Sequence, residues 1–395
     1  MDSGPEDNRQ ITDASLEETN PSAPAALSPG QSAIRDEESG GVLERPWYKR
    51  LSLWKLGLFV ASLYLFILAI TMMKEGARGL VPLLENVFAV SSVPNSLGFG
   101  WLSAYIIMSG SPVAASVLTF FDAGVLDELN TYAMITGSRI GASFIVLFIG
   151  FLYVLRGRNL ASSLSMGLLS LIVTATTYIP SFFIGLFLLR VGWLDDVQLQ
   201  FGVLLNAVID GIINPFVALV SDLFPPWAVF LLGLGIILMS FKLFDMCLPQ
   251  MSLAHSQYGQ VSRLIYHPLV MFALGAAITM ISMSVSLSLS ILVPLSNRGF
   301  IRRENVIPYI MGANVTTFVD TLLAAALLDN PNAFTIVLVG MVGISLVSVA
   351  ILVVLHRPYR HFTLKFVDWI TANKRNMAMF MVVILVSPIV LILLF

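Results

Sequence analysis

Long apolar stretches make up most of the sequence after residue 44, and short polar segments separate them. A helix needs about 20 predominantly apolar residues to cross the hydrocarbon core of a bilayer. Eight stretches approach or exceed this length: about 53–73, 131–155, 164–190, 200–221, 227–247, 305–328, 333–355 and 377–395. The pattern predicts an all-α polytopic membrane protein.

Two further apolar stretches, about 97–121 and 268–296, are interrupted by Gly, Pro or a run of serines. Backbone breaks at membrane depth are tolerated only where protein or a water-filled cavity satisfies the freed polar groups. We therefore expect each stretch to form a re-entrant hairpin, a pair of short helices that enters the membrane and returns to the same side.

The two interrupted stretches belong to an internal repeat. Met108–Ser111 lies 29 residues before Gly137–Gly141, and Met283–Ser286 lies 29 residues before Gly312–Thr316. The second pair follows the first by 175 residues, and the same shift brings several predicted spans of one half onto those of the other. The predicted membrane repeats comprise residues 45–221 and 222–395.

Basic residues indicate the direction of the repeats, because positively charged flanks stay on the cytoplasmic side. The cluster before the first span, which includes Lys49 and Arg50, predicts a cytoplasmic N-terminus. The later clusters lie on that side only if the second repeat is inverted, which requires an odd number of crossings per half. These clusters are Arg298, Arg302 and Arg303, followed by Arg357, Arg360, Lys365, Lys374 and Arg375. One stretch is then not a simple span, and 200–221 is the candidate because Gly211 and Pro215 weaken a helix.

The composition excludes a water-soluble globular enzyme. Of the 395 residues, 57% are hydrophobic and 12% are charged, against roughly 25% charged in soluble domains. Residues 1–44 differ, because they hold ten of the 24 acidic residues and few apolar side chains. Such a segment cannot bury enough surface to offset its ordering entropy. We expect a disordered, acidic cytoplasmic tail on a protein of the plasma (inner) membrane.

No motif for an enzyme or a metal centre is found. The sequence lacks a GxxxxGK[ST] phosphate loop, a GxSxG nucleophile elbow and an HExxH zinc motif. Its single cysteine, Cys247, excludes an intramolecular disulfide and a Cys-rich zinc site. We expect no enzymatic activity, no cofactor, no metal other than a sodium ion and no nucleic-acid partner.

Hydroxyl side chains concentrate at the two predicted hairpins. Serines occupy every second position from 282 to 290, and Ser109, Ser111 and Ser116 lie around Gly110. These hydroxyls can bond to carbonyls of their own helices or fill close helix contacts. Alternatively, they form hairpin tips at which free N–H groups and hydroxyls meet an anion or a cation. Two tips that approach from opposite faces would form one site near the midplane.

A second polar set is predicted at the beginning of the 305–328 span. It comprises Asn314, Thr316, Thr317, Asp320 and Thr321. The oxygen atoms of these side chains suit an alkali cation such as sodium. The corresponding first-half segment carries Arg139, which is costly at this depth unless it faces protein or water and has a partner.

Three interpretations of the intramembrane charges remain open. Arg139 forms a structural ion pair with Asp210 or Asp320, or either acid is a proton or cation site, or the acids are exposed. Asp210 would share one helical face with Asn206 and Asn214. Arg139 could also hold an anionic substrate through its planar guanidinium.

The paired motifs resemble those of the type II sodium–phosphate cotransporter family, which has two related halves. Each half of that family carries a Gln-Ser-Ser-Ser hairpin tip followed later by Gly-(Ala/Ser)-Asn-(Ile/Val)-Gly-Thr-Thr. Motif-level resemblance is confined to about 100–145 and 275–325, and Gly312–Val315 fits best. The resemblance implies phosphate binding at the Ser109–Ser111 and Ser284–Ser286 tips, and sodium binding by groups that include Asn314 and Thr317.

The sequence departs from the family pattern at the same places in both halves. The family glutamine is Met108 and Met283, the middle serines are Gly110 and Val285, and the first-half asparagine is Arg139. A methionine cannot donate a hydrogen bond to phosphate. The protein therefore binds its anion differently, for example through Arg139, or carries another cargo. Arg139 occupies the position that matches a residue of the family's ion site. Its guanidinium could therefore be a built-in cation that replaces one sodium ion.

We expect a secondary transporter that couples symport of phosphate or a related anion to sodium by alternating access. Substrate-binding residues are then Ser109, Gly110, Ser111, Arg139, Ser284, Val285 and Ser286, and coupling-ion residues are Asn314, Thr316, Thr317, Asp320 and Asp210. Two alternatives stay open, a transporter of another organic or lipid-like anion coupled to protons and a non-transporting membrane scaffold. The expected partners are the anion, sodium and membrane lipids, and an oligomer is compatible with the sequence.

Overall fold

The computed structural model describes residues 53–83, 92–155, 160–197, 209–247, 267–290, 292, 302–328 and 330–394. For residues 53, 81–83, 149–155, 160–163, 286, 287 and 290 this description is limited to the backbone. The expected acidic tail, residues 1–44, lies outside the described residues, as do Asn206 and Arg298.

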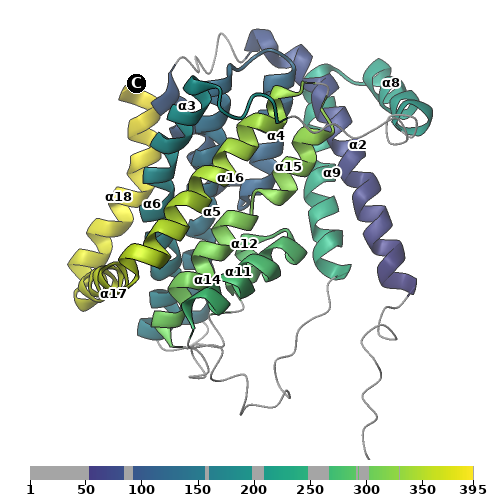
Figure 1. Ribbon diagram of the computed structural model, residues 1–395. Coiled ribbons are helices and arrows are strands. Elements are labelled where there is room, and N and C mark those ends of the chain that lie inside the picture. The colour runs from purple at the N-terminus through teal and green to yellow at the C-terminus, as the bar shows by residue number, and fades with distance from the viewer. Residues whose placement is uncertain are drawn as a thin grey trace, which may run out of the picture. The chain divides into compact units, whose positions relative to one another are not determined.

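The described elements are all helical (Figure 1). The longer helices are α2 (Leu53–Leu83), α5 (Glu128–Leu155), α6 (Leu160–Val191), α9 (Pro226–Cys247), α16 (Asn332–Ala350), α17 (His356–Ala372) and α18 (Lys374–Leu394). The shorter ones are α3 (Val93–Ile107), α4 (Gly110–Asp122), α8 (Asn214–Leu223), α11 (Pro268–Ser282), α12 (Val285–Ser290), α14 (Arg303–Thr316) and α15 (Val319–Ala326). Two π-helical turns are η3 (Ile209–Ile213) and η4 (Ile351–Leu355).

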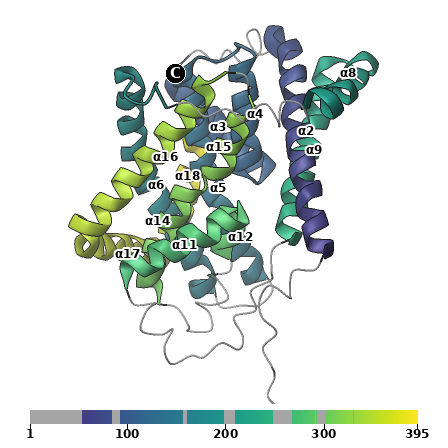
Figure 2. The same ribbon diagram turned by 45° about the vertical axis from the view of Figure 1, so that its right-hand side comes forward.

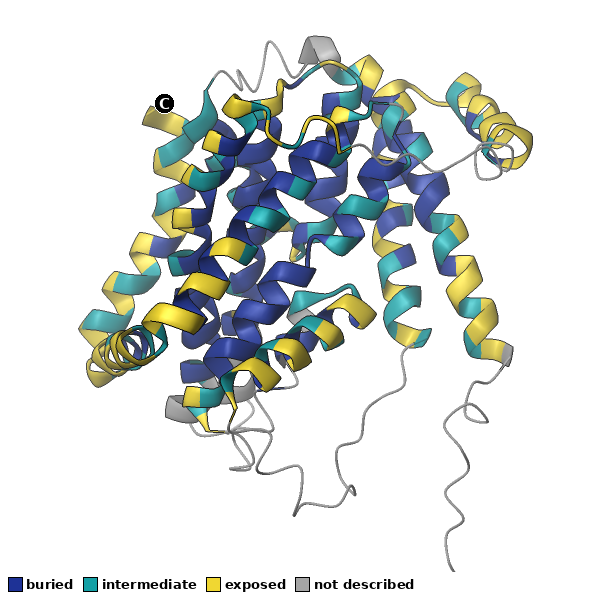
Figure 3. Ribbon diagram, in the orientation of Figure 1, coloured by how far each residue is buried: buried dark blue, intermediate teal, exposed yellow. Residues whose placement is uncertain are grey.

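Seven helical segments of the described chain are long and apolar enough to cross a membrane. They are Trp54–Leu80, Glu128–Phe148, Leu164–Val191, Pro226–Cys247, Arg303–Ala326, Asn332–Ala372 and Lys374–Leu394. The protein is therefore an all-α integral membrane protein. Apolar side chains remain exposed on the outer faces of the bundle while its centre is buried (Figure 3), as expected where lipid replaces water around the helices.

The remaining predicted span, 200–221, is not among these seven segments, and its residues 200–208 lie outside the described part of the chain. Its described part is the π-helical turn η3 followed by the ten residues of α8, which is too short to cross the hydrocarbon core. The helix α17 was not expected, because its cations break the apolar pattern. In Figure 1 it is seen end-on and lies across the direction of the other helices.

Two helix pairs are broken at single methionines. Met108 separates α3 from α4 and has a φ of 57°, and Met283 separates α11 from α12 and has a φ of 48°. These are the two non-glycine residues with positive φ in the described chain, a backbone conformation that is uncommon for such residues. In Figures 1 and 2, α3 and α4 lie in the upper part of the bundle and α11 and α12 in its lower part.

Glycines allow α3 to touch α5, and α11 to touch α14. A Cβ on Gly100 would overlap the backbone of Met134, and one on Gly137 would overlap the backbone of Leu97. In the second half, Gly275 has the same relation to Tyr309 and Gly312 to Phe272. Every one of these four positions follows its first-half counterpart by 175 residues. These glycine contacts between α3 and α5 thus recur between α11 and α14.

The Gly137→Ala variant is expected to lower the free energy of unfolding by about 1–3 kcal/mol, because the added methyl group forces the α3 and α5 backbones apart. Thermal unfolding in detergent micelles, followed by tryptophan fluorescence, measures this loss. Gly57→Ala is the matched control, since nothing lies within 4 Å of the added Cβ at that position in α2. An unchanged melting temperature for Gly137→Ala would contradict the close helix contact.

The two hairpin helices differ in what covers them. On α3, the Asn95 side chain donates a hydrogen bond to the Ile392 carbonyl of α18 at 3.0 Å, and the Tyr105 hydroxyl donates to the Ile384 carbonyl at 3.2 Å. The helix α11 instead exposes apolar side chains, including Leu269, Met280 and Ile281. Met280 is the residue that corresponds to Tyr105.

Candidate functional site

A cavity of 410 Å³ lies where the break between α3 and α4 meets the break between α11 and α12. One wall is formed by Met108, Ser109, Gly110 and Ser111, and another by Met283, Ser284 and Val285. Arg139, Thr317 and the lower half of α9 complete its lining. The structure thus brings most of the expected substrate residues to one cavity, although they come from segments that are far apart in the chain.

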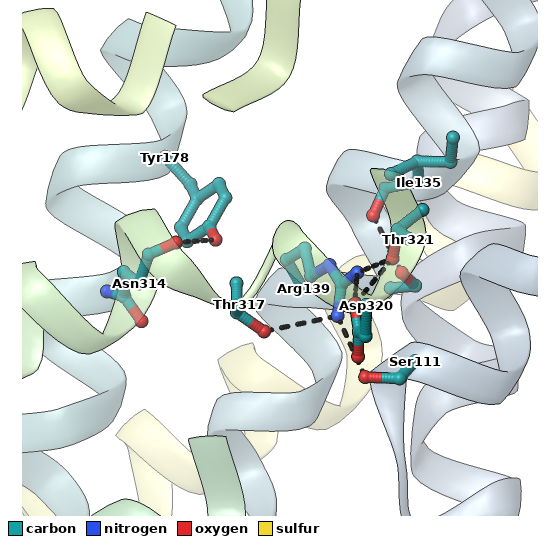
Figure 4. Close-up of polar contacts among 9 residues, drawn as sticks. Ser111, Ile135, Arg139, Tyr178, Asn314, Thr317, Asp320 and Thr321 are labelled. Carbon is teal, nitrogen blue, oxygen red and sulfur yellow. Dashed lines mark hydrogen bonds and ion pairs between the residues drawn. The ribbon is translucent and has the colours of Figure 1, made fainter. Parts of the chain in front are cut away.

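Arg139 is the buried cation of this site, with 2% of its side chain exposed. Its Nη1 donates hydrogen bonds to Ser111 Oγ and Thr317 Oγ1, both at 3.2 Å. Its Nη2 donates to Asp320 Oδ1 at 3.2 Å and to Thr321 Oγ1. Figure 4 shows these side chains converging on the guanidinium from α4 and from the junction of α14 with α15.

The Arg139–Asp320 ion pair confirms one of the three interpretations of the intramembrane charges. The Asp320 side chain is also 2% exposed, and Thr321 Oγ1 donates a hydrogen bond to its Oδ1 at 2.8 Å. The Arg139 guanidinium lies 5.3 Å from the ring centroid of Phe318, a cation–π contact that adds to the ion pair. Two buried atoms, Asp320 Oδ2 and Arg139 Nε, have no hydrogen-bond partner among the described residues.

The remaining expected coupling-ion residues do not converge on one point. The side-chain amide of Asn314 donates a hydrogen bond to Thr174 Oγ1 at 3.1 Å. The backbone carbonyl of Asn314 accepts a hydrogen bond from the Tyr178 hydroxyl at 3.0 Å (Figure 4). Thr316 Oγ1 donates to the Ala276 carbonyl of α11 at 2.9 Å. The expected location was also wrong, since the polar set lies at the junction of α14 with α15 and not at the beginning of the span.

Asp210 lies in a different pocket. It is exposed on η3, accepts a hydrogen bond from Asn214 Nδ2 at 2.9 Å, and lines a 630 Å³ pocket between α2 and α8. Lys74 lines the same pocket and forms a 3.2 Å ion pair with Asp122 at the end of α4. The alternative in which Arg139 pairs with Asp210 is therefore wrong, and the alternative of an exposed acid fits Asp210.

Several serines of the hairpins serve helix packing. Ser288 Oγ accepts a hydrogen bond from Thr279 at 2.8 Å and lies 2.9 Å from the Tyr309 hydroxyl. Ser282 and Ser116 bond to carbonyls of their own helices. For these three residues the packing interpretation holds. Ser284 lines the cavity, whereas the side chain of Ser286 lies outside the described part of the structure.

Two ionisable residues of the cavity were missed by sequence reasoning. Lys242 and Asp245 lie one helical turn apart on α9, and both line the cavity. Charged residues inside an apolar stretch are uncommon and face protein or water. Their position within the apolar 227–247 stretch therefore indicated that they face protein or water. Neither residue belongs to the repeated motifs from which the site was predicted.

The cavity combines groups that suit an anion. Lys242 contributes a positive charge one helical turn from the carboxylate of Asp245, Arg139 contributes a guanidinium whose charge is balanced by Asp320, and α4 begins there. The first backbone N–H groups of a helix have no carbonyl partner within it, and the helix dipole adds partial positive charge at this end. The described residues contain no group of three or more His, Cys, Asp or Glu side chains arranged to hold a metal ion.

Comparisons with protein families, curated protein sequences and solved structures found no match to this chain.

Proposed function

We propose that the protein is a secondary transporter of phosphate or a related anion that works by alternating access, with sodium as the coupling ion. One observation carries the proposal. Two broken helix pairs that lie in opposite parts of the bundle meet at one cavity, together with a buried arginine. A ligand-sized site between broken helices is the arrangement on which secondary transporters rely.

An inverted repeat with two re-entrant hairpins is part of the proposal. The helices α3 and α11 begin 175 residues apart, as do the methionine breaks and the paired glycine contacts. The helix α2 begins at the lower end of Figure 1, whereas the adjacent α9 ends there. Three of the seven spans belong to residues 45–221, and an odd number of crossings in the first half inverts the second half.

A cytoplasmic N-terminus in the plasma (inner) membrane accounts for the charge distribution. The helices α14 and α18 begin at the lower end of Figure 1, where α17 also lies, and ion pairs of Arg303 with Asp368 and of Arg360 with Glu304 join α17 to α14. Basic residues are retained on the cytoplasmic side, which supports placing the start of α2 there.

Uptake into proteoliposomes tests the function. Vesicles that contain the purified protein and receive an inward sodium gradient are expected to accumulate labelled phosphate above its equilibrium level. Vesicles in which choline replaces sodium, and vesicles without protein, are the controls. Absence of phosphate accumulation under both sodium and proton gradients would reject the phosphate assignment.

The apolar part of the cavity lining favours a second candidate function, transport of an organic or lipid-like anion coupled to protons. Met108, Met283, Leu238 and Phe241 line the cavity next to the charged groups, and apolar lining with few polar groups is typical of sites for organic ligands. A thermal-shift screen distinguishes the two candidates, because a ligand that binds only the folded state raises the melting temperature. Stabilisation by phosphate and not by organic anions would reject the second candidate.

A further inference from the structure

The guanidinium of Arg139 is surrounded by oxygen atoms. Ser111 Oγ, Thr317 Oγ1, Asp320 Oδ1 and Thr321 Oγ1 accept its hydrogen bonds. We call these four atoms the oxygen shell. It consists of one carboxylate and three hydroxyl oxygens, which are the ligand types that hard cations select in proteins.

Charge balance in the oxygen shell requires one monovalent cation. Asp320 is the single carboxylate among the described residues that contacts Arg139, and both side chains are almost completely buried. A buried carboxylate without a counter-charge is strongly unfavourable. If the guanidinium were removed, the oxygen shell would keep one negative charge and an unfilled space at its centre. Asp320 Oδ2, which is buried and has no partner among the described residues, would add a fifth oxygen.

The oxygen shell also joins parts of the chain that the hairpin architecture separates. Ser111 belongs to the first turn of α4, whereas Thr317, Asp320 and Thr321 come from the junction of α14 with α15. A cation at its centre therefore holds a hairpin tip against an interrupted helix. In this protein the cation is covalently attached and cannot leave.

We propose that Arg139 is the built-in occupant of a monovalent-cation site whose ligands are the oxygen shell. Removal of its side chain converts the site into one that binds free sodium. This inference concerns the site itself and needs no transport. For the proposed function it means that Thr317 and Asp320 do not exchange sodium in the native protein, so that a coupled sodium ion binds at other groups.

Thermal unfolding of the purified full-length chain in detergent tests this inference. The melting temperature of Arg139→Ala is expected to rise by several degrees and to saturate as sodium chloride replaces choline chloride at constant ionic strength. The native protein is expected to show no such dependence. Millimolar guanidinium chloride should also stabilise Arg139→Ala, because free guanidinium matches the group that was removed.

Three variants control for general effects of salt. Arg139→Lys keeps an attached cation and should not respond to sodium, and the Arg139→Ala/Asp320→Asn double variant lacks the carboxylate and should not respond either. Arg190→Ala, which removes an exposed cation at the end of α6, should behave like the native protein. The proposal is overturned if Arg139→Ala shows the sodium dependence of the native protein, or if it fails to fold in sodium as well as in choline. Neither result would bear on phosphate uptake by the native protein.

Discussion

Asp320→Asn is expected to lower the free energy of unfolding by about 3–5 kcal/mol, which is the usual cost of removing one partner of a buried ion pair. The amide that replaces the carboxylate carries no charge, so that the Arg139 guanidinium stays buried without a counter-ion. The hydroxyls of Thr317 and Thr321 would still accept its hydrogen bonds, but they cannot neutralise it. Thermal or denaturant-induced unfolding in micelles measures the loss.

A surface pair provides the matched comparison for Asp320. Asp368 lies 3.4 Å from Arg303 with 68% of its side chain exposed, and Asp368→Asn should change stability by less than about 1 kcal/mol. The double variant Asp320→Asn/Arg139→Met removes both charges and should recover much of the stability that Asp320→Asn loses. Equal melting temperatures for Asp320→Asn and Asp368→Asn would mean that the Arg139–Asp320 pair is solvated.

Lys242→Glu is expected to lower phosphate uptake at subsaturating concentration by roughly 100-fold. The substitution turns a positive side chain of the cavity wall into a negative one. Two unit charges about 12 Å apart interact by about 1.4 kcal/mol at an effective dielectric constant of 20, which is about tenfold, and reversal of one charge changes the interaction by twice that amount. Lys242→Gln removes the charge without reversing it, so that about a tenfold loss is expected. Initial rates of labelled phosphate uptake into proteoliposomes measure both effects.

Lys365→Gln is the control for Lys242, because it removes an exposed cation of α17 that does not line the cavity. Its uptake rate should stay within about twofold of that of the native protein. Melting temperatures of all three variants separate loss of transport from loss of folded protein. Native uptake by Lys242→Glu would show that the anion does not pass through this cavity.

Much of the fold is predictable from hydropathy, because every helix that crosses the membrane must span the same thickness of hydrocarbon. The methionine breaks at 108 and 283 were predictable as well, since Gly, Pro and Ser next to them oppose a continuous helix. The missed helix, α17, has its apolar residues on one face and cations on the other. A test for long apolar stretches does not detect a helix of this kind.

The sequence motifs predicted which polar residues belong to the candidate site. They did not predict which of these residues contact one another. Spacing identified Ser111, Arg139 and Asp320 as members of a polar set, but it allowed Arg139 to pair with either Asp210 or Asp320. The choice depends on where η3 and α8 pack, and the structure places Asp210 of η3 in a pocket beside α2. Lys242 is brought to the cavity by the packing of α9, which depends on contacts between helices distant in sequence.

The unequal covering of α3 and α11 gives the bilayer unequal access to the two halves of the protein. Hydrogen bonds to α18 restrain α3, whereas among the described residues Leu269, Met280 and Ile281 of α11 stay exposed to the surroundings of the bundle. Lipid packing and bilayer thickness consequently act on α11 directly and on α3 through an intervening helix. A conformational cycle that needs both hairpins to shift would then depend on membrane composition mainly in the step that moves α11.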